Sequence, residues 1–388
     1  MKASTVSIVK TCKNPKDDDI RSAVTKAVDL IGGIEKFVDP RSKVLVKPNM
    51  CWAWQELKVT TDPRVTAAVV ELCIKAGAKE VFVGEGAGVG MDTDKVFDLT
   101  GTRELAEKAG AKVVDFKDIE SVSIVNPQGV KMKLFKVSKL VKECDTLINV
   151  PLMKIDCPTT FSCALKNWAG ILNDDDKLNV LHRMGMYWTL SDLLGAARQD
   201  MIVVDGITPP EVFPGGMLRE MDLILAGNDP VAIDAVASKT MGVEPMEIHT
   251  TRIASERGLG NASLSSIEIK GEPVEKVMVR YDKPPRYVGE LKEDHRFKDI
   301  NFVDGLACSG CVQAILFTWS KKVKPEIMKR IKDLTVLIGP LADVPTGATK
   351  VLLLGKCLKH LKGQGVLVDG CVPCADDLMK GIKQLYGI

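Results

Sequence analysis

Short apolar runs and longer amphipathic segments alternate along most of this chain. Thr5–Val9, Lys43–Val46 and Thr146–Val150 are brief and largely apolar, whereas Asp17–Ile31 repeats its apolar residues with helical spacing. A brief apolar run bounded by turn residues is typical of a strand that is buried on both faces of a parallel sheet. The alternation therefore predicts an α/β fold with a doubly wound, mostly parallel sheet that is covered by helices on both faces.

Further elements continue this alternation. Thr61-Asp62-Pro63 predicts the start of a helix that ends near Ala76, because Thr or Asp can cap a helix and proline suits its first turn. The alternating segment Val122–Val137, which contains Pro127-Gln128-Gly129, predicts a β-hairpin added to the main sheet. The other predicted elements are strands at Glu80–Val83, Lys112–Asp115, Met201–Val204 and Asp222–Ala226, and helices at Leu190–Ala197 and Pro230–Met241.

The C-terminal part repeats the α/β pattern on a smaller scale. Its predicted strands are Asn301–Val303, Thr335–Ile338, Val351–Leu354 and Val366–Val368. The span Val279–Asp299 before them is rich in charge and proline, which is typical of a connection between domains. We therefore expect a large α/β substrate-binding domain over residues 1–278, a linker over residues 279–299, and a small α/β cysteine-ligated cluster domain over residues 300–388.

The composition argues against some classes of binding partner. With a formal net charge of +2 and 5% aromatic residues, the chain lacks the basic field and stacking platforms of nucleic-acid-binding proteins. It has no apolar run of membrane-spanning length and no apolar signal core at its N-terminus, so we expect a cytoplasmic protein without a membrane partner. A homo-oligomer is compatible with these features. In a reducing compartment, paired cysteines are more often metal-binding or catalytic than disulfide-bonded.

Cysteines gather beside glycines in the C-terminal part. The motifs are Cys308-Ser-Gly-Cys311, Gly355-Lys-Cys357 and Gly370-Cys371-Val-Pro-Cys374. Because the loops that follow parallel strands share one edge of a sheet, these cysteines are expected to converge. Four thiolates hold an iron–sulfur cluster, so we expect Cys308, Cys311, Cys357 and Cys371 to bind such a cluster, with Cys374 as a spare candidate. The alternatives are a zinc site made of the two Cys-x-x-Cys pairs, and a redox dithiol or ordinary cysteines without a metal.

A second set of polar residues follows the strands of the large domain. Lys47 and Asn49 end one apolar run, Lys154 follows another, and Lys166-Asn167 lies in an apolar segment, where a buried polar group needs a partner. Open α/β sheets bind ligands in the crevice at the carboxyl ends of their strands, and three lysines there favour an anionic small-molecule substrate. Capping and turn formation are the alternative role for each residue taken singly. The same expected crevice includes Glu85, Asn149, Asp205, Asn228 and Asp229.

Several motifs of the large domain occur together in a known family. They are Val46-Lys-Pro-Asn49, Thr60-Thr-Asp-Pro63, Asn149-Val-Pro-Leu-Met-Lys154, Ala164-Leu-Lys-Asn167 with Gly170, and Asp234-Ala-Val-Ala237. With them, the region from about Val44 to Gly260 resembles the family catalogued as domain of unknown function 362. The resemblance implies an iron–sulfur-associated protein of unassigned activity. Many members carry a compact ferredoxin-type run of cysteines, which is replaced here by dispersed cysteines.

The C-terminal motifs have a resemblance of their own. The order Cys-x-x-Cys, Gly-x-Cys and Gly-Cys-x-Pro is similar to the cluster-binding pattern of hydrogenase small subunits and their respiratory-complex relatives. Gly370-Cys371-Val372-Pro373 stands here in place of their Gly-Cys-Pro-Pro. This resemblance implies a [4Fe–4S] cluster on an α/β scaffold and leaves the substrate open.

These features lead to one main functional hypothesis. An iron–sulfur oxidoreductase would pass electrons between its [4Fe–4S] cluster and the anionic molecule, with a ferredoxin or flavoprotein as electron partner. Lys154, Lys166 and Asn167 would hold the substrate, and Lys47 and Asn49 would line its pocket. Three alternatives remain: a cluster acting as Lewis acid in a lyase or dehydratase, a non-enzymatic cluster or metal carrier, and a zinc-stapled binding module.

Overall fold

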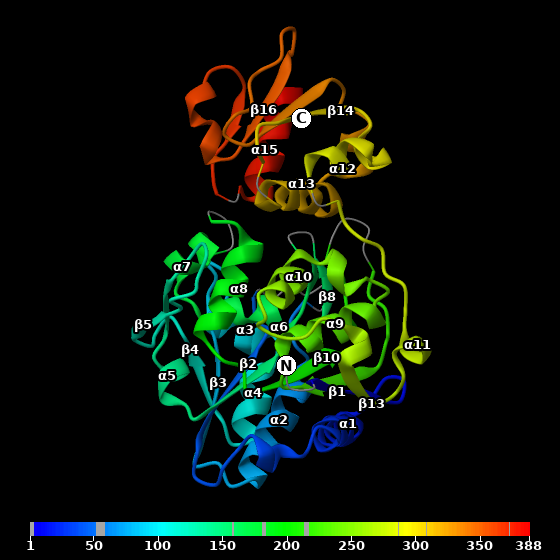
Figure 1. Cartoon of the computed structure of the whole chain (residues 1–388). Helices are drawn as coiled ribbons and strands as arrows, with labels where there is room; N and C mark the ends of the chain where they lie inside the picture. The colour runs from blue at the N-terminus through cyan, green and yellow to red at the C-terminus, as the bar shows by residue number, and fades with distance from the viewer. Residues whose placement is uncertain are drawn as a thin grey trace. The chain divides into compact units, whose positions relative to one another are not determined.

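The computed structural model describes two compact units (Figure 1). The larger consists mostly of residues before Asp282, and the smaller mostly of Asp282–Ile388. The structure describes residues 4–51, 59–156, 159–180, 184–212, 217–285, 287–307, 309–371 and 373–388. Within these ranges, no helix is both long enough and apolar enough to cross a membrane.

A mostly parallel sheet forms the centre of the larger unit. In its described residues, eight strands lie in the order β13-β1-β12-β10-β7-β2-β3-β4. Neighbouring strands are parallel except at β12, which runs antiparallel to both β1 and β10. The predicted α/β class with a mostly parallel sheet is therefore confirmed. The strand bounds are β1 (Ser4–Lys10), β2 (Lys43–Pro48), β3 (Glu80–Glu85), β4 (Lys112–Asp115), β7 (Thr146–Val150), β10 (Met201–Gly206), β12 (Leu223–Gly227) and β13 (Ile267–Gly271).

Apolar side chains on both faces of this sheet are buried. In β2, Val44 and Val46 pack into a core that includes α1 (Asp17–Leu30) and α2 (Pro63–Lys75), whereas Leu45 packs with Trp168 in a second core. Successive strand residues point to opposite faces, so a wholly apolar strand needs cover on both. The other helices of this unit are α3 (Thr93–Leu99), α4 (Thr102–Lys108), α5 (Leu140–Glu143), α6 (Ala164–Asn167), α7 (Asp174–Leu178), α8 (Met186–Ala196), α9 (Pro230–Thr240), α10 (His249–Glu256) and α11 (Val274–Val277).

The start of α2 follows the predicted capping chemistry. The Asp62 side chain accepts a hydrogen bond of 2.9 Å from the backbone N–H of Arg64, and Pro63 occupies the first turn. A capping carboxylate satisfies one of the N–H groups that have no partner inside the helix. The predicted start of this helix is therefore confirmed.

The predicted hairpin forms, but it does not join the main sheet. β5 (Ser121–Val125) and β6 (Leu134–Ser138) pair antiparallel as a two-stranded sheet of their own. A short three-stranded sheet was also not expected; it consists of β8 (Lys154–Asp156), β9 (Thr160–Ser162) and β11 (Glu211–Val212). Alternating polarity predicts that a segment is a strand with one buried face, but it does not identify the neighbouring strand.

The smaller unit has a parallel sheet of four strands within its described residues, in chain order. Part of the predicted linker Val279–Asp299 is folded, because Val288 and Leu291 of α12 and the nearby Phe297 are buried in the core of this unit. The strands are β14 (Ile300–Asp304), β15 (Leu334–Ile338), β16 (Lys350–Leu354) and β17 (Val366–Val368), and the helices are α12 (Val288–Glu293), α13 (Ser309–Lys321), α14 (Pro325–Met328) and α15 (Ala375–Tyr386).

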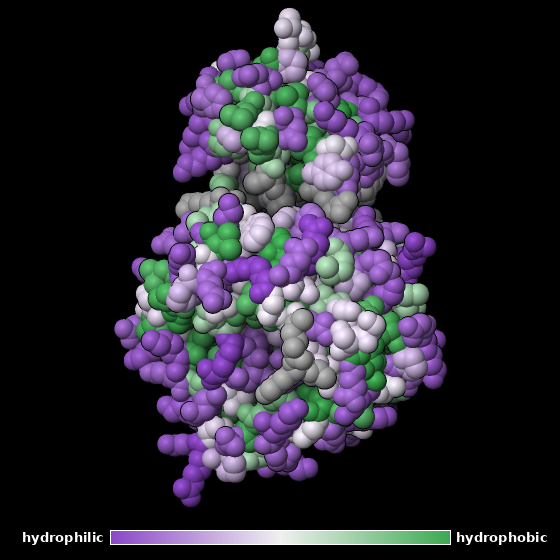
Figure 2. Space-filling model, in the orientation of Figure 1, coloured by the Kyte–Doolittle hydropathy of each residue, from purple (hydrophilic) through white to green (hydrophobic). Residues whose placement is uncertain are grey.

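Hydrophilic residues predominate on the visible face of the molecule, with apolar residues scattered among them (Figure 2). Two of the most exposed apolar side chains belong to the smaller unit, where Leu306 is 74% exposed and Leu341 is 68% exposed. Single exposed apolar residues are common on folded proteins and need no special explanation.

Asp192 in α8 holds the turn of the β5–β6 hairpin. Its buried carboxylate accepts hydrogen bonds from the backbone N–H groups of Val130 (2.9 Å), Lys131 (2.8 Å) and Met132 (2.9 Å). The guanidinium of Arg257 donates another at 2.7 Å. Burial alone would raise the pKa of Asp192, but these four donors outweigh it and lower the pKa below its ordinary value of 3.8.

Replacing this carboxylate should destabilise the larger unit. We expect Asp192→Asn to lower the free energy of unfolding by about 3–5 kcal/mol, because it leaves Arg257 without its counter-ion. Since the folded pKa of Asp192 is depressed, the wild type should lose this stabilisation as the pH falls below about 3.8, and the variant should not. Urea unfolding followed by circular dichroism at neutral and acid pH measures both effects. Asp118→Asn, at an exposed position, is the control and should be neutral.

Candidate functional site

The carboxyl ends of β2 and β7 meet at a change of direction in the sheet. β2 and β7 are neighbours, and the next strands of the central sheet along the chain, β3 and β10, lie on opposite sides of this pair. Open α/β sheets bind ligands outside the carboxyl ends of strands at such a switch point. Lys47 and Asn149 are register partners near the ends of these two strands, so both stand at this place on one face of the sheet.

Lys47 is fully buried there in an ion pair. Its Nζ lies 2.7 Å from Glu85 Oε2, 3.0 Å from the carbonyl oxygen of Pro48 and 3.3 Å from Asn167 Oδ1. Burial lowers the pKa of Lys47, and the carboxylate of Glu85 opposes this shift. An ammonium group has three N–H donors, and three acceptors surround this one. Lys47 therefore serves as a junction between β2, β3 and α6.

Asn167 extends this network to the neighbouring strand. Its amide Nδ2 donates to Asn149 Oδ1 at 2.7 Å, while Asn149 Nδ2 donates to the carbonyl of Ala164 at 2.9 Å and to Gln199 Oε1 at 2.7 Å. Asn149 and Asn167 thus bind one another and connect the short helix α6 to the sheet. Because these polar groups are buried and paired, they fix the position of α6 without the cost of an unsatisfied donor.

The first turn of α6 is held from the other side by Asp234. This buried carboxylate accepts from the backbone N–H of Ala164 at 2.7 Å and of Leu165 at 3.4 Å. Burial raises the pKa of Asp234 to about 7. Asp234 lies in the Asp-Ala-Val-Ala motif that the sequence singled out, and its contacts give that motif a structural role.

Gly170 leaves room for the Lys47–Glu85 pair. A Cβ atom at this position would lie 1.9 Å from Glu85 Oε1 and 2.5 Å from Lys47 Cε. No side chain fits at such distances without displacing the ion pair. The Lys166-Asn-Trp-Ala-Gly170 element thus combines an asparagine that binds the network, a tryptophan in the core and a glycine that gives clearance.

The structure adds Lys177, which the sequence did not single out. Its buried Nζ donates to the carbonyl oxygens of Gly86 at 2.7 Å and Ala87 at 3.0 Å, and so holds the glycine-rich loop after β3. Lys177 follows an acidic run whose Asn173 caps α7 by accepting from the N–H of Asp176 at 2.9 Å. A lysine in a helix of five residues, directly after an acidic run, gave no sequence signal of burial.

The other predicted pocket residues lie near the same strand ends. Asn49 Nδ2 and Lys154 Nζ both approach the carbonyl oxygen of Val59, at 2.6 Å and 3.4 Å. Both residues are buried, and Lys166 is half-buried in α6. The structure thus places Lys47, Asn49, Asn149 and Lys154 near one edge of the sheet, and their roles toward a substrate stay predictions. The prediction for Asn228 and Asp229 is wrong: they follow β12, which runs antiparallel to its neighbours, so they lie at the opposite edge, where Asp229 accepts a hydrogen bond of 2.6 Å from Ser4 at the start of β1.

Asp205 is the last residue but one of β10, at this edge of the sheet. Its buried carboxylate accepts from the N–H of Asp62 at 2.8 Å and of Ile207 at 3.0 Å. Burial and the neighbouring carboxylate of Asp62 raise the pKa of Asp205 to about 7. Asp205 therefore ties the start of α2 to the end of β10.

In the smaller unit, two of the predicted cluster ligands meet at Gly355. Gly355 has a φ of +109°, and a Cβ built on it would lie 3.5 Å from Cys311 Sγ and 3.4 Å from Cys357 Sγ. Cys311 is buried in α13, with its Sγ 3.9 Å from the carbonyl oxygen of Leu354 at the end of β16. These two cysteines are distant in sequence and adjacent in space.

The loop after β17 joins the same edge. The backbone N–H of Lys356 donates to the carbonyl oxygen of Gly370 at 2.9 Å, which ties the turn of Cys357 to the residue before Cys371. Cys357 and Cys371 are exposed, as is Cys374 immediately before α15. We call the segments that carry Cys311, Cys357, Cys371 and Cys374 the cysteine edge.

Cys308, the fifth predicted ligand, lies outside the described residues. Among those that are described, no three histidine, cysteine or carboxylate side chains stand close enough to hold a metal ion. The donor types and the glycines of the cysteine edge nevertheless fit a thiolate-bound cluster. The predicted convergence of cysteines from separate loops is seen for Cys311 and Cys357.

Comparison with known proteins finds a matching family model and a distant relative. The family model described as a domain of unknown function (DUF362) matches residues 44–239, about half of the chain. A thylakoid-associated protein of Synechocystis sp. is 26% identical over 239 residues, which cover 59% of this chain and 72% of that relative. The matched family region includes Lys47, Asn167 and Asp234 and ends before the cysteine edge.

Two solved structures share a distant likeness with this chain. The lactate racemase apoprotein from Thermoanaerobacterium thermosaccharolyticum aligns with a TM-score of 0.39 at 14% identity, over 58% of this chain and 54% of that one. A protein from Thermotoga maritima aligns with a TM-score of 0.37 at 12% identity, over 63% and 60%. This chain thus spans less than two thirds of the length of both.

Breaking the buried ion pair from one side should cost more than removing it from both sides. We expect Lys47→Met to lower the free energy of unfolding by about 3–5 kcal/mol, because the buried Glu85 loses its hydrogen-bonded counter-ion and keeps only the charge of Lys177, which is not bonded to it. Adding Glu85→Gln should recover part of this loss, with a coupling energy of at least about 1 kcal/mol. Urea unfolding of the wild type, the two single variants and the double variant gives the four free energies of unfolding of this double-mutant cycle.

The exposed pair Lys112–Glu80 on β4 and β3 offers a matched control. Lys112→Met should cost less than about 1 kcal/mol, as is usual for surface pairs. Strictly additive effects at Lys47 and Glu85 would contradict the assignment of this pair as a structural junction.

Proposed function

The chain belongs to the DUF362 family, and we propose that it is an iron–sulfur protein with a [4Fe–4S] cluster at its cysteine edge. The ligands would be Cys308, Cys311, Cys357 and Cys371, with Cys374 as the spare thiol. The observation that carries this proposal is the approach of Cys311 and Cys357 to Gly355, from elements far apart in sequence.

The chemistry of the edge supports this choice of cofactor. Thiolates are the usual ligands of iron–sulfur clusters, and backbone N–H groups near the sulfurs tune their potential. Gly355 keeps a side chain away from the sulfurs of Cys311 and Cys357, and the N–H of Lys356 joins this turn to the carbonyl oxygen of Gly370. The thiols of Cys357, Cys371 and Cys374 are exposed, so assembly of a cluster would not require unfolding of the core.

The proposed activity is that of an oxidoreductase. Such a cluster supplies one-electron transfer, here between an anionic small molecule at the strand ends of the larger unit and a ferredoxin or flavoprotein in the cytoplasm. Lys154, Lys166 and Asn167 would contact the molecule. Lys47 would act as a positioning residue, because its buried ammonium holds Asn167 in place, and Asn49 would line the pocket beside Val59.

Metal and sulfide analysis tests the cluster directly. Protein purified without oxygen should contain about four iron and four sulfide per chain, and the reduced protein should give the EPR signal of a [4Fe–4S] centre. Serine at Cys308, Cys311, Cys357 or Cys371 should abolish or convert this signal, whereas Cys374→Ser should preserve it.

The same set of variants separates the alternatives. Stoichiometric zinc without iron would overturn the proposal in favour of a zinc-stapled module. A cluster that needs only three cysteines would replace electron transfer with Lewis-acid chemistry as the proposed role, because one iron would have an open position.

Gly355 provides a second test of the site. We expect Gly355→Ala to reduce the iron content at least about twofold, because the added methyl group would contact both sulfurs and the glycine has a positive φ. Gly347→Ala is the matched control, since Gly347 also has a positive φ (+84°) but its Cβ would meet no atom within 4 Å. Equal loss of iron in both variants would assign the effect to backbone strain alone.

A further inference from the structure

We propose that the larger unit binds a small organic cation, one with a primary ammonium group, in a cavity beside Asp222. This site is separate from the proposed cluster and from the proposed anionic substrate. None of Lys47, Asn49, Lys154, Lys166 and Asn167 lines the cavity, so it does not depend on their roles.

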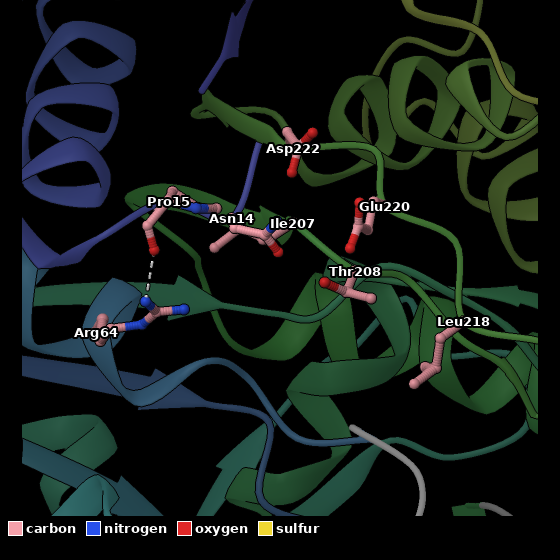
Figure 3. A pocket seen from close by; sticks show the side chains of 8 residues that line it. All are labelled: Asn14, Pro15, Arg64, Ile207, Thr208, Leu218, Glu220 and Asp222. Carbon is pink, nitrogen blue, oxygen red and sulfur yellow. Dashed lines mark hydrogen bonds between the residues drawn. The ribbon is translucent and has the colours of Figure 1, made fainter. Parts of the chain in front are cut away.

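The cavity has a volume of about 430 Å³ and opens where β10 ends and β12 begins. Asp222 and Glu220 lie on one side of the opening with Thr208, and Arg64 from the first turn of α2 lies on the opposite side (Figure 3). Ile207 and Leu218 form an apolar part of the cavity wall. A space of this size suits a small molecule.

Asp222 is the feature that favours a cationic ligand. The residue is 4% exposed, and its backbone is bonded through its carbonyl oxygen to the N–H of Thr11 at 2.7 Å and through its N–H to Ile207 at 3.0 Å. Its carboxylate has no hydrogen bond or ion pair with any described residue and lies on the cavity. A largely desolvated carboxylate whose oxygens face only the cavity has a weakly compensated charge, and a bound cation would compensate it better. Burial raises its pKa, and the charge of Glu220 adds to this effect.

The cavity carries a net negative charge. The guanidinium of Arg64 is already paired with Asp62, through Nε to Oδ1 at 2.9 Å and Nη2 to Oδ2 at 2.7 Å. Its Nη1 donates to the carbonyl oxygen of Pro15 at 2.7 Å. The charge of Arg64 is therefore balanced by Asp62, and it does not neutralise the carboxylates of Asp222 and Glu220.

Two lysines act on Asp222 from outside the cavity. Lys10 and Lys13 oppose the rise in its pKa, but both are exposed, so water and salt weaken their effect. They do not supply the buried partner that Asp222 lacks.

The chemistry favours an ammonium compound over a metal ion. A hard divalent cation takes six or more oxygen ligands, and the cavity offers two carboxylates and the hydroxyl of Thr208 opposite a guanidinium. An alkylammonium needs only two or three acceptors, and its carbon chain can pack on Ile207 and Leu218. The cavity thus fits a primary amine with an aliphatic stem.

Titration of the full chain with n-butylammonium tests this proposal. Calorimetry at neutral pH should show saturable binding, whereas 1-butanol and butanoate, its neutral and anionic counterparts, should bind at least about tenfold more weakly. Asp222→Asn should weaken n-butylammonium at least about tenfold. Asparagine tolerates the φ of +56° at this position, so the variant should keep the fold, which circular dichroism checks. Glu220→Gln should weaken binding less, because Glu220 is exposed.

Glu275→Gln, at another exposed acidic position of the larger unit, is the control and should bind as the wild type does. The proposal fails if the wild type shows no saturable binding up to on the order of 10 mM. It also fails if Asp222→Asn binds equally well or if 1-butanol binds as tightly as the amine.

Discussion

The charge of Lys47 is the constraint on which the larger unit depends. An ammonium group that is fully buried needs a counter-ion and acceptors, or its desolvation would outweigh the packing around it. Glu85 from the end of β3, the carbonyl of Pro48 and the amide of Asn167 meet this need. Three segments of the chain must therefore converge at one point of the sheet edge. The clearance at Gly170 follows from the same requirement.

The network also separates structural polar groups from candidate binding groups. The side-chain donors of Lys47, Asn149 and Asn167 bond to acceptors from the protein itself, so these three groups hold the scaffold together. Asp222 differs, because its carboxylate is buried at a cavity and the described residues leave it unpaired. A satisfied buried group explains a fold, whereas an unsatisfied one that faces open space points to a ligand.

Much of the fold could be predicted because short apolar runs mark buried strands. Thr146–Val150 and Val366–Val368 were predicted with their observed bounds. The partner of the β5–β6 hairpin could not be predicted, since polarity shows which face is buried and not which strand lies beside it. The strands β8, β9 and β11 contain only two or three residues each, too few to display a period. The helix within the predicted linker could not be predicted, because the high charge of this span is typical of an unfolded connection; its Val288 and Leu291 are nevertheless buried.

The same geometric rule made both sheet edges partly predictable. Loops after parallel strands gather at one edge, so Lys47 could be expected near Asn149, and Cys311 near Cys357. The rule does not give the pairing within an edge. The ion pair between Lys47 and Glu85 depends on the positions of two side-chain tips, which the strand pattern does not give. The burial of Lys177 depends on the conformation of the loop after β3, which has no hydrophobic periodicity from which it could be predicted. The sequence therefore indicates at which sheet edge the polar and cysteine residues gather. To decide which of them stabilise the fold and which could bind a ligand, the hydrogen-bond partners of each residue must be known.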